Sequence, residues 1–201
     1  MKKILISTLR QEKTSLKDFR EAADRLATLL AAESGKELPR KKIEIKTPLE
    51  STEGEVLLHE PLLVPILRSG LTLLPAFLQF YPKAPVGFVG MKRDEATAIP
   101  KLYYKHLPTL TKETPVFLLD PMIATGGSAS LAIEELKKEG ALEKNISLIA
   151  CVASPEGVQY LEKTYPELSL HIAELDQGLN KSKFIVPGLG DYGDRYFGEV
   201  D

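Results

Sequence analysis

The chain is short of cysteine, histidine and net charge, and each shortage excludes a class of protein. Its one cysteine, Cys151, cannot form a disulfide within the chain, which predicts a reducing, cytoplasmic setting and a buried, unreactive thiol. His59, His106 and His171 are scattered without the spacing of metal ligands. A net charge of -2, from 26 basic and 28 acidic residues, gives no general attraction to nucleic acid or to an anionic membrane.

Long apolar segments and the two best-known nucleotide signatures are also missing. The most apolar region, residues 62–80, is interrupted by Pro65, Arg68 and Pro75, so it is not a membrane span. The apolar run at the N-terminus is too short for a signal peptide. No lysine lies between Asp120 and Lys137, which excludes a nucleoside-triphosphate loop, and Gly-x-Gly-x-x-Gly is absent after the strand that precedes Asp120.

What the chain does contain is an alternation of apolar strands and amphipathic helices. We expect strands at 62–67, 86–91, 116–119, 146–153 and 170–175, and helices at 71–80, 129–139 and 156–164. Continuous apolar strands between such helices predict an α/β fold with a mostly parallel sheet covered on both faces. Ligands of these sheets bind at the carboxyl ends of strands, where Arg68, Arg93 and Asp120 fall.

The remaining segments flank this core within one domain, residues 1–201. Residues 1–60 form a lead-in, 61–178 the core and 179–201 a tail. Apolar spacing in the lead-in predicts a helix over 14–33, capped by Thr14 or Ser15 and ended by Gly35. Alternation predicts a half-exposed strand over 41–47, and residues 48–54 are expected to be turn-like.

Residues 116–128 are the most informative segment. An apolar strand ends in the carboxylate of Asp120, and a turn ending in Gly126, Gly127 and Ser128 leads into a helix that we expect Ser128 to cap. The N–H groups of these three residues would be unpaired at the helix N-terminus and so could bind a phosphate. Asp120 could accept hydrogen bonds from ribose hydroxyls. The alternative is an ordinary surface turn before a helix with a serine cap.

Three other segments carry candidate ligand-binding groups. Residues 92–110 form a charged excursion containing prolines, which is either a lid with Arg93 at its base or a solvated β-hairpin. Arg68 precedes Ser69-Gly70 at the start of a helix, where it could bind pyrophosphate oxygens or pair with a neighbouring acid. The glycine-dense segment 184–195 could turn its main-chain groups toward a small planar ligand, or it could simply close the sheet.

Taken in this order, the segments resemble the motifs of uracil phosphoribosyltransferases, a branch of the type I phosphoribosyltransferases. Residues 120–128, Asp-Pro-Met-Ile-Ala-Thr-Gly-Gly-Ser, are similar to the loop that binds 5-phosphoribosyl 1-diphosphate (PRPP), including the proline in second position. Residues 64–70 resemble the pyrophosphate loop and 93–104 the mobile hood. Residues 152–157 resemble a downstream strand-to-helix turn, and 184–195 resemble the uracil-binding tail.

The resemblance implies pyrimidine salvage: transfer of the phosphoribosyl group from PRPP to uracil, giving UMP and pyrophosphate. It implies a type I phosphoribosyltransferase fold with a protruding hood, residues 92–110, and a C-terminal base-binding tail. The implied catalytic residues are Arg68, Arg93, Asp120 and Asp191. The same four are implied to bind PRPP, together with Pro121, Met122, Ile123, Ala124, Thr125, Gly126, Gly127 and Ser128. Main-chain groups at Ile185, Gly190, Asp191 and Tyr192 are implied to bind uracil.

The resemblance also implies Mg²⁺ held mainly by PRPP and water rather than by protein ligands. It implies a cytoplasmic homo-oligomer, dimer or tetramer, with no nucleic-acid or membrane partner, and a non-proline cis peptide near Arg68-Ser69. Tyr192 departs from the family pattern, since many members have alanine there, and an inward ring would shrink the base pocket. Two alternatives stay open: a phosphoribosyltransferase for another base, and a non-catalytic regulator that binds UMP or RNA, for instance through the basic patch 40–42.

Overall fold

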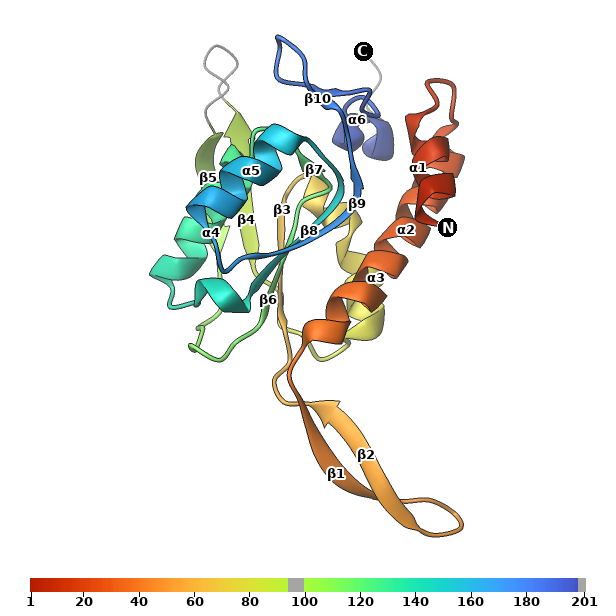
Figure 1. Ribbon diagram of the computed structural model, residues 1–201, viewed down its shortest axis with the longest axis vertical. Helices are drawn as coiled ribbons and strands as arrows, with labels where there is room; N and C mark the ends of the chain where they lie inside the picture. The colour runs from red at the N-terminus through yellow and green to blue at the C-terminus, as the bar shows by residue number, and fades with distance from the viewer. Residues whose placement is uncertain (94–99, 199–201) are drawn as a thin grey trace.

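A seven-stranded sheet forms the centre of the chain in a computed structural model that describes residues 1–93 and 100–198 (Figure 1). Its strands run in the order β5-β4-β3-β6-β8-β9, with the short β7 also beside β8. They are β3 (Leu62–Leu67), β4 (Phe88–Arg93), β5 (Pro100–His106), β6 (Val116–Leu119), β7 (Met122–Ile123), β8 (Ile146–Ala153) and β9 (Ser169–Leu175). Every pairing is parallel except that of β4 with β5, which confirms the predicted parallel character.

Helices cover both faces of this sheet. On one side lie α1 (Lys2–Arg10), α2 (Leu16–Ser34) and α3 (Leu74–Phe80), and on the other α4 (Gly127–Lys138) and α5 (Pro155–Thr164). Neighbouring strand residues point to opposite faces. Leu63 and Phe117 therefore pack into the core with α1 to α3, while Leu62 and Leu118 pack into the core with α4 and α5. Burial on both faces explains why the strands are continuous apolar runs.

The lead-in contains one helix that was predicted and one that was not. Helix α2 begins after Ser15, whose Oγ accepts a hydrogen bond from the Asp18 N–H at 3.1 Å, and this confirms the predicted cap. A short 3-10 turn, Gly35–Glu37, follows it. Helix α1, over residues 2–10, is not among the elements expected from the sequence. It forms there because Leu5, Ile6 and Leu9 lie on one helical face and are buried.

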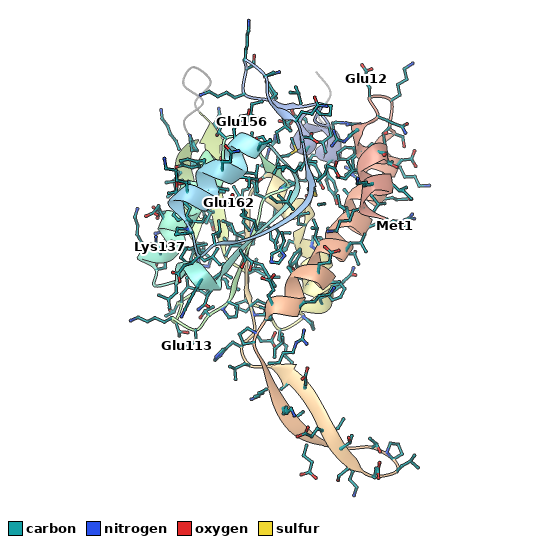
Figure 2. All side chains as sticks on the ribbon, in the orientation of Figure 1. Met1, Glu12, Glu113, Lys137, Glu156 and Glu162 are labelled. Atoms are coloured by element: carbon teal, nitrogen blue, oxygen red, sulfur yellow. The ribbon has the colours of Figure 1, made fainter. Side chains whose placement is uncertain are left out.

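An antiparallel hairpin, the arm, projects from the rest of the chain (Figures 1 and 2). It consists of β1 (Arg40–Lys46) and β2 (Ser51–Leu57). The turn that we expected over 48–54 is wrong from Ser51 onward. Thr47 closes the turn early, because its N–H donates to the Glu50 carbonyl at 2.9 Å and its Oγ1 accepts the Glu50 N–H at 3.0 Å. The chain can therefore return as a strand at residue 51.

Several other elements differ from expectation at their ends. The helix expected at 71–80 is divided into a 3-10 turn, Ser69–Thr72, and α3. A third 3-10 turn, Glu143–Asn145, precedes β8. The tail is not simply a loop, since it holds β10 (Gly178–Leu179), β11 (Ile185–Val186) and α6 (Tyr192–Phe197). No helix within the described residues has the length and apolarity needed to cross a membrane.

Candidate active site

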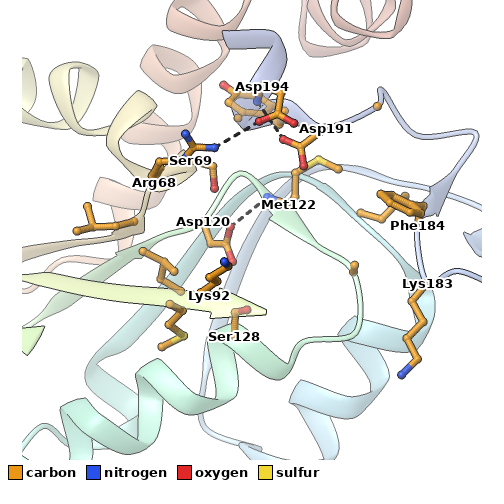
Figure 3. A pocket seen from close by; sticks show the side chains of 18 of the residues that line it. Arg68, Ser69, Lys92, Asp120, Met122, Ser128, Lys183, Phe184, Asp191 and Asp194 are labelled. Carbon is orange, nitrogen blue, oxygen red and sulfur yellow. Dashed lines mark hydrogen bonds and ion pairs between the residues drawn. The ribbon is translucent and has the colours of Figure 1, made fainter. Parts of the chain in front are cut away.

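A cleft of about 680 Å³ lies where β3, β4 and β6 end, between the sheet and the tail (Figure 3). It lies at the carboxyl ends of parallel strands, as expected for this class of sheet. The predicted residues that line it are Arg68, Asp120, Met122, Ala124, Ser128, Ile185, Gly190, Asp191 and Tyr192. Segments more than 100 residues apart in sequence, such as those of Arg68 and Asp191, therefore meet at one site.

Some predicted residues belong to the site's segments without lining the cleft. Pro121, Ile123, Thr125, Gly126 and Gly127 complete the segment 120–128, which we call the phosphate loop. Arg93 is the last residue of β4, and its side chain, like hood residues 94–99, lies outside the described part of the chain. The role predicted for Arg93 stays a prediction.

The phosphate loop joins β6 to α4 through a glycine with a positive φ angle. Asp120 follows β6 and is 8% exposed at the floor of the cleft, where one carboxylate oxygen lies 3.4 Å from the Met122 N–H. Gly126 has a φ of 77° and is the N-cap of α4, so the cap that we predicted at Ser128 is wrong by two residues. A left-handed glycine turns the chain into the helix without a side-chain cap. Ser128 instead lies in the first turn and lines the cleft.

The first turn of α5 supports the phosphate loop from behind. The Ser154 Oγ donates a hydrogen bond to the Ala124 carbonyl at 2.6 Å and also caps α5 by accepting the Gly157 N–H at 3.0 Å. A Cβ on Gly157 would stand 2.3 Å from the Ala124 oxygen, so this approach requires glycine. The turn 152–157 is therefore connected to the cleft through the loop's main chain.

Arg68 lies beside the phosphate loop because its turn packs closely against β6. A Cβ on Gly70 would stand 2.2 Å from the Leu119 carbonyl oxygen. The non-proline cis peptide expected near Arg68-Ser69 is the Leu67-Arg68 bond, one residue earlier. The Arg68 guanidinium lies 3.4 Å from a carboxylate oxygen of Asp194, and both side chains are about half exposed at the cleft.

The tail forms the opposite wall of the cleft. Gly190 has a φ of 80°, and Asp191 caps α6 by accepting the Asp194 N–H at 3.0 Å. The Tyr192 side chain is 1% exposed and packs edge-on against the Phe19 ring, with centroids 5.4 Å apart. The ring is thus part of the hydrophobic core.

A buried hydroxyl and thiol lie beneath this wall. Burial raises the pKa of the Cys151 thiol to about 12, although a hydrogen bond with Tyr192 acts in the opposite direction. Burial also raises the pKa of the Tyr192 hydroxyl well above its usual value. Both groups therefore stay protonated at neutral pH, and Cys151 is not a nucleophile.

Sequence reasoning missed several residues that line the cleft. They are Ile66, Leu67, Ser69, Met91, Lys92, Tyr103, Lys183, Phe184, Gly193 and Asp194. Figure 3 labels Ser69, Lys92, Lys183, Phe184 and Asp194 among them. Lys92 and Phe184 each adjoin a predicted residue, so their proximity to the cleft could have been read from the sequence. Asp194 could be found only by predicting α6, because one helical turn separates it from Asp191.

Comparisons with known proteins show the family of the chain. A sequence model described as uracil phosphoribosyltransferase matches residues 1–199. The chain is 46% identical over 194 residues to a uracil phosphoribosyltransferase of Streptococcus salivarius, covering 96% of this chain and 92% of that protein. A solved structure of a protein from Aquifex aeolicus is similar with a TM-score of 0.91 and 36% identity, covering 99% of this chain and 95% of that one.

A more distant likeness bears on the fold alone. An adenine phosphoribosyltransferase of Rhodothermus marinus superposes with a TM-score of 0.52 at 16% identity, covering 75% of this chain and 78% of that one. Its resemblance agrees with the α/β architecture, in which helices flank a mostly parallel sheet. The family match over almost the whole chain and the close curated relative carry the assignment. The chain belongs to the uracil phosphoribosyltransferase family.

Proposed function

We propose that the chain transfers the 5-phosphoribosyl group of PRPP to uracil, giving UMP and pyrophosphate in pyrimidine salvage. The observation that carries this proposal is the meeting of the phosphate loop, Arg68 and the tail at one cleft in a member of this family. The reaction replaces pyrophosphate at C1′ of the ribose by N1 of uracil. It needs little covalent chemistry from the protein, so catalysis would come from positioning the reactants and stabilising charge.

The phosphate loop would bind the 5′-phosphate and the ribose of PRPP. Helix α4 begins at Gly127, so N–H groups of its first turn have no helical acceptor and carry the positive end of the helix dipole. The 5′-phosphate would lie against them, within the main chain of residues 122–128. Asp120, on the floor of the cleft, would accept hydrogen bonds from the ribose hydroxyls.

Arg68 and Arg93 would stabilise the departing pyrophosphate. A guanidinium offers paired N–H donors that match phosphate oxygens. Arg68 follows the end of β3, and Arg93 is the last residue of the neighbouring strand β4. Arg68 is paired with Asp194 in this structure, so the pyrophosphate would compete with, or be added to, that contact. Closure of the hood over the cleft would exclude water, which would otherwise hydrolyse the activated sugar.

The tail would select the base with main-chain groups. Uracil presents acceptor, donor and acceptor along one edge, and the peptide groups near Ile185 and Gly190 can match that pattern. Cytosine carries an amine in place of one carbonyl, so donor would face donor and buried groups would stay unpaired. Asp191 lines the same cleft, where it would face the sugar and help to accept the N1 proton of uracil.

We also propose that Mg²⁺ takes part, bound mainly by PRPP oxygens and water. Within residues 1–93 and 100–198 no cluster of three or more His, Cys, Asp or Glu side chains could hold a metal ion. The cleft carboxylates also have other partners: Asp191 caps α6, and Asp194 pairs with Arg68. This donor set fits a hydrated Mg²⁺ that reaches the protein with its phosphate ligand, where it would neutralise charge on the pyrophosphate.

The expectations of a homo-oligomer and of a cytoplasmic location are proposals too. The arm exposes Leu49, Ile43, Ile45 and Val56 away from the core, and a second copy of the chain could cover such side chains. The single buried thiol, Cys151, is compatible with a reducing compartment.

The regulator alternative finds little support in the arm. Arg40 and Lys42 of the basic patch form ion pairs with Glu55 and Glu53, at 3.6 Å and 3.0 Å, so acidic neighbours offset their charge. We propose that the chain has no nucleic-acid or membrane partner. A gel shift with pyrimidine-gene leader RNA tests this, and binding of that RNA without turnover of uracil would favour the regulator.

A panel of bases tests the proposed reaction. Purified protein, PRPP and Mg²⁺ are incubated separately with uracil, cytosine, hypoxanthine, guanine or orotate, and nucleotide and pyrophosphate are both quantified. We expect UMP with one pyrophosphate per nucleotide, and little product from the other bases. Equal or faster turnover of a purine or of orotate would overturn the assignment to uracil while leaving the phosphate loop intact.

A further inference from the structure

The segment 187–191, which we call the base turn, needs support from outside itself. Gly188 and Gly190 have φ angles of 62° and 80°, in the left-handed region that glycine adopts readily. A Cβ at Gly188 would stand 2.2 Å from the Ile185 carbonyl oxygen, so the turn is also tight. Glycine lowers the cost of this shape but does not hold it, because glycine is flexible. Side chains elsewhere must restrict the turn.

One support comes from β9 and α1. The Asp176 carboxylate is buried and accepts the Gly188 N–H at 2.9 Å. Arg10, the last residue of α1, pairs with both oxygens of Asp176, and its guanidinium also approaches the Gly188 carbonyl at 3.4 Å. The Asp176 N–H is in turn bonded to the Ala153 carbonyl at the end of β8, at 2.8 Å. The first half of the base turn is therefore tied to the sheet by charge-assisted hydrogen bonds.

A second support comes from α6. The Arg195 guanidinium donates to the Leu189 carbonyl at 2.6 Å and to the Gln11 carbonyl at 2.6 Å, and it also bonds the Leu9 carbonyl. It lies 4.6 Å from the centroid of the Phe19 ring. The last carbonyls of a helix lack helical donors and carry negative partial charge, so Arg195 stabilises the end of α1 as well. Figure 1 shows α1, near the N-terminus, and α6, near the C-terminus, next to each other.

The two supports act on consecutive peptide groups of the base turn. The Gly188 N–H, the Gly188 carbonyl and the Leu189 carbonyl are all hydrogen-bonded to side chains that do not line the cleft. The next residues, Gly190 and Asp191, line the cleft itself. The orientations of neighbouring peptide groups are coupled, since rotating one peptide plane moves the next. A guanidinium that holds Leu189 therefore also sets the direction of the groups that face the base.

We propose that Arg10, Asp176 and Arg195 form a clasp that positions the base turn, so that helix α1 is part of the base site. This inference rests on the proposed function for its ligand, uracil, but the clasp itself is a property of the fold. None of the three residues lines the cleft, so they are positioning residues rather than catalytic ones. Their loss changes base affinity and base choice more than PRPP binding, because Asp191 is the one predicted PRPP contact that lies in the base turn.

Kinetics of Arg195→Met with a matched control test the clasp. The substitution keeps most of the side-chain stem and removes the donors to Leu9, Gln11 and Leu189. Arg20→Met is the control, because Arg20 also contacts α6, through the Tyr196 carbonyl at 2.8 Å, without touching the base turn. We expect Arg195→Met to raise the KM for uracil by about tenfold or more, the effect of losing charged hydrogen bonds. The KM for PRPP should rise less than the KM for uracil.

Two further variants separate positioning from loss of folding. Arg10→Met removes the other half of the clasp and should also raise the KM for uracil selectively. Arg195→Lys keeps the charge but offers no planar fork, so its KM for uracil should fall between those of wild type and Arg195→Met. If Arg195→Met does not fold, these two variants carry the test. A KM for uracil equal to that of Arg20→Met, or equal rises in both KM values, would overturn the inference.

A readout that needs no turnover separates this inference from the proposed function. Amide hydrogen exchange across residues 187–191 should be faster in Arg195→Met and Arg10→Met than in wild type and Arg20→Met. If the wild-type protein does not use uracil, the proposed function fails, and the exchange data alone decide whether the clasp holds the turn. Unchanged exchange in both clasp variants would overturn the clasp whatever the substrate.

Discussion

Gly127→Val separates binding of PRPP from stability of the fold. Gly127 is the first residue of α4, and a Cβ built there meets its nearest neighbours, Pro100 and Thr125, at 3.5 Å and 3.6 Å. These are ordinary contact distances, and valine is at least as good a helix former as glycine. We therefore expect the free energy of unfolding to change by less than about 1 kcal/mol.

The effect on the ligand should be much larger. The isopropyl group stands beside the N–H groups at the start of α4, where glycine leaves room for an anion to approach the main chain. Each hydrogen bond to a charged group contributes about 1.5–3 kcal/mol. Loss of two such bonds raises the Kd for PRPP by roughly 10²- to 10⁴-fold. Calorimetric titration with PRPP and Mg²⁺, together with thermal unfolding, measures both quantities.

The adjacent glycine provides the contrasting control. Gly126 has a φ of 77°, and a Cβ there would stand 2.9 Å from the Tyr160 ring and 3.1 Å from the Gly157 carbonyl oxygen. Gly126→Ala should therefore destabilise the fold, with about 1–2 kcal/mol from the left-handed backbone alone. A folded Gly127→Val variant that binds PRPP as tightly as wild type would refute the phosphate-loop argument.

Four other outcomes follow from the site. Arg93→Ala should lower kcat more than it raises the KM for uracil, because its partner is the leaving group; an effect on uracil KM alone would assign Arg93 to the base pocket. Tyr192→Phe should leave the ratio of uracil to cytosine turnover unchanged, since the ring is buried in the core, and an altered ratio would contradict this. Removing Mg²⁺ with a chelator should abolish turnover without lowering the Tm; a lower Tm would indicate a structural metal. Because burial raises the pKa of Cys151 from about 9 to about 12, its contribution to stability is complete below about pH 9 and is lost as the pH rises toward 12. The free energy of unfolding should fall more steeply between pH 9 and pH 12 for wild type than for Cys151→Ala. Parallel curves for the two proteins would contradict the raised pKa of Cys151.

The parts of the fold that the sequence predicted are those with strong local signals. Leu62, Leu63 and Val64 are all buried because helices cover both faces of β3, and such a run can be recognised without a structure. The cap of α2 at Ser15 and the carboxylate at Asp120 are equally local, since each depends on residues a few positions away. The order of the motifs along the chain, which resembles that of uracil phosphoribosyltransferases, then predicted that the phosphate loop and the tail belong to one site.

The parts that were not predicted depend on distant partners. Helix α1 is short, and the apolar face formed by Leu5, Ile6 and Leu9 is too brief a pattern to identify a helix without its packing against α2. The glycines of the tail masked α6, and with it the pairing of Arg68 with Asp194 across 126 residues. The clasp is likewise invisible in sequence, because Arg10 and Asp176 are 166 residues apart. The direction of the Tyr192 ring could not be predicted from the sequence either, since it depends on packing against residues far away in the chain.

A competition between uracil and cytosine tests the central claim most directly. Equal concentrations of the two bases are mixed with limiting PRPP, Mg²⁺ and the wild-type protein, and UMP and CMP are quantified by mass spectrometry at early times. Main-chain reading of the uracil edge predicts an excess of UMP of about 100-fold or more, because the wrong base leaves buried groups unpaired. Comparable amounts of UMP and CMP, or no UMP at all, would contradict it.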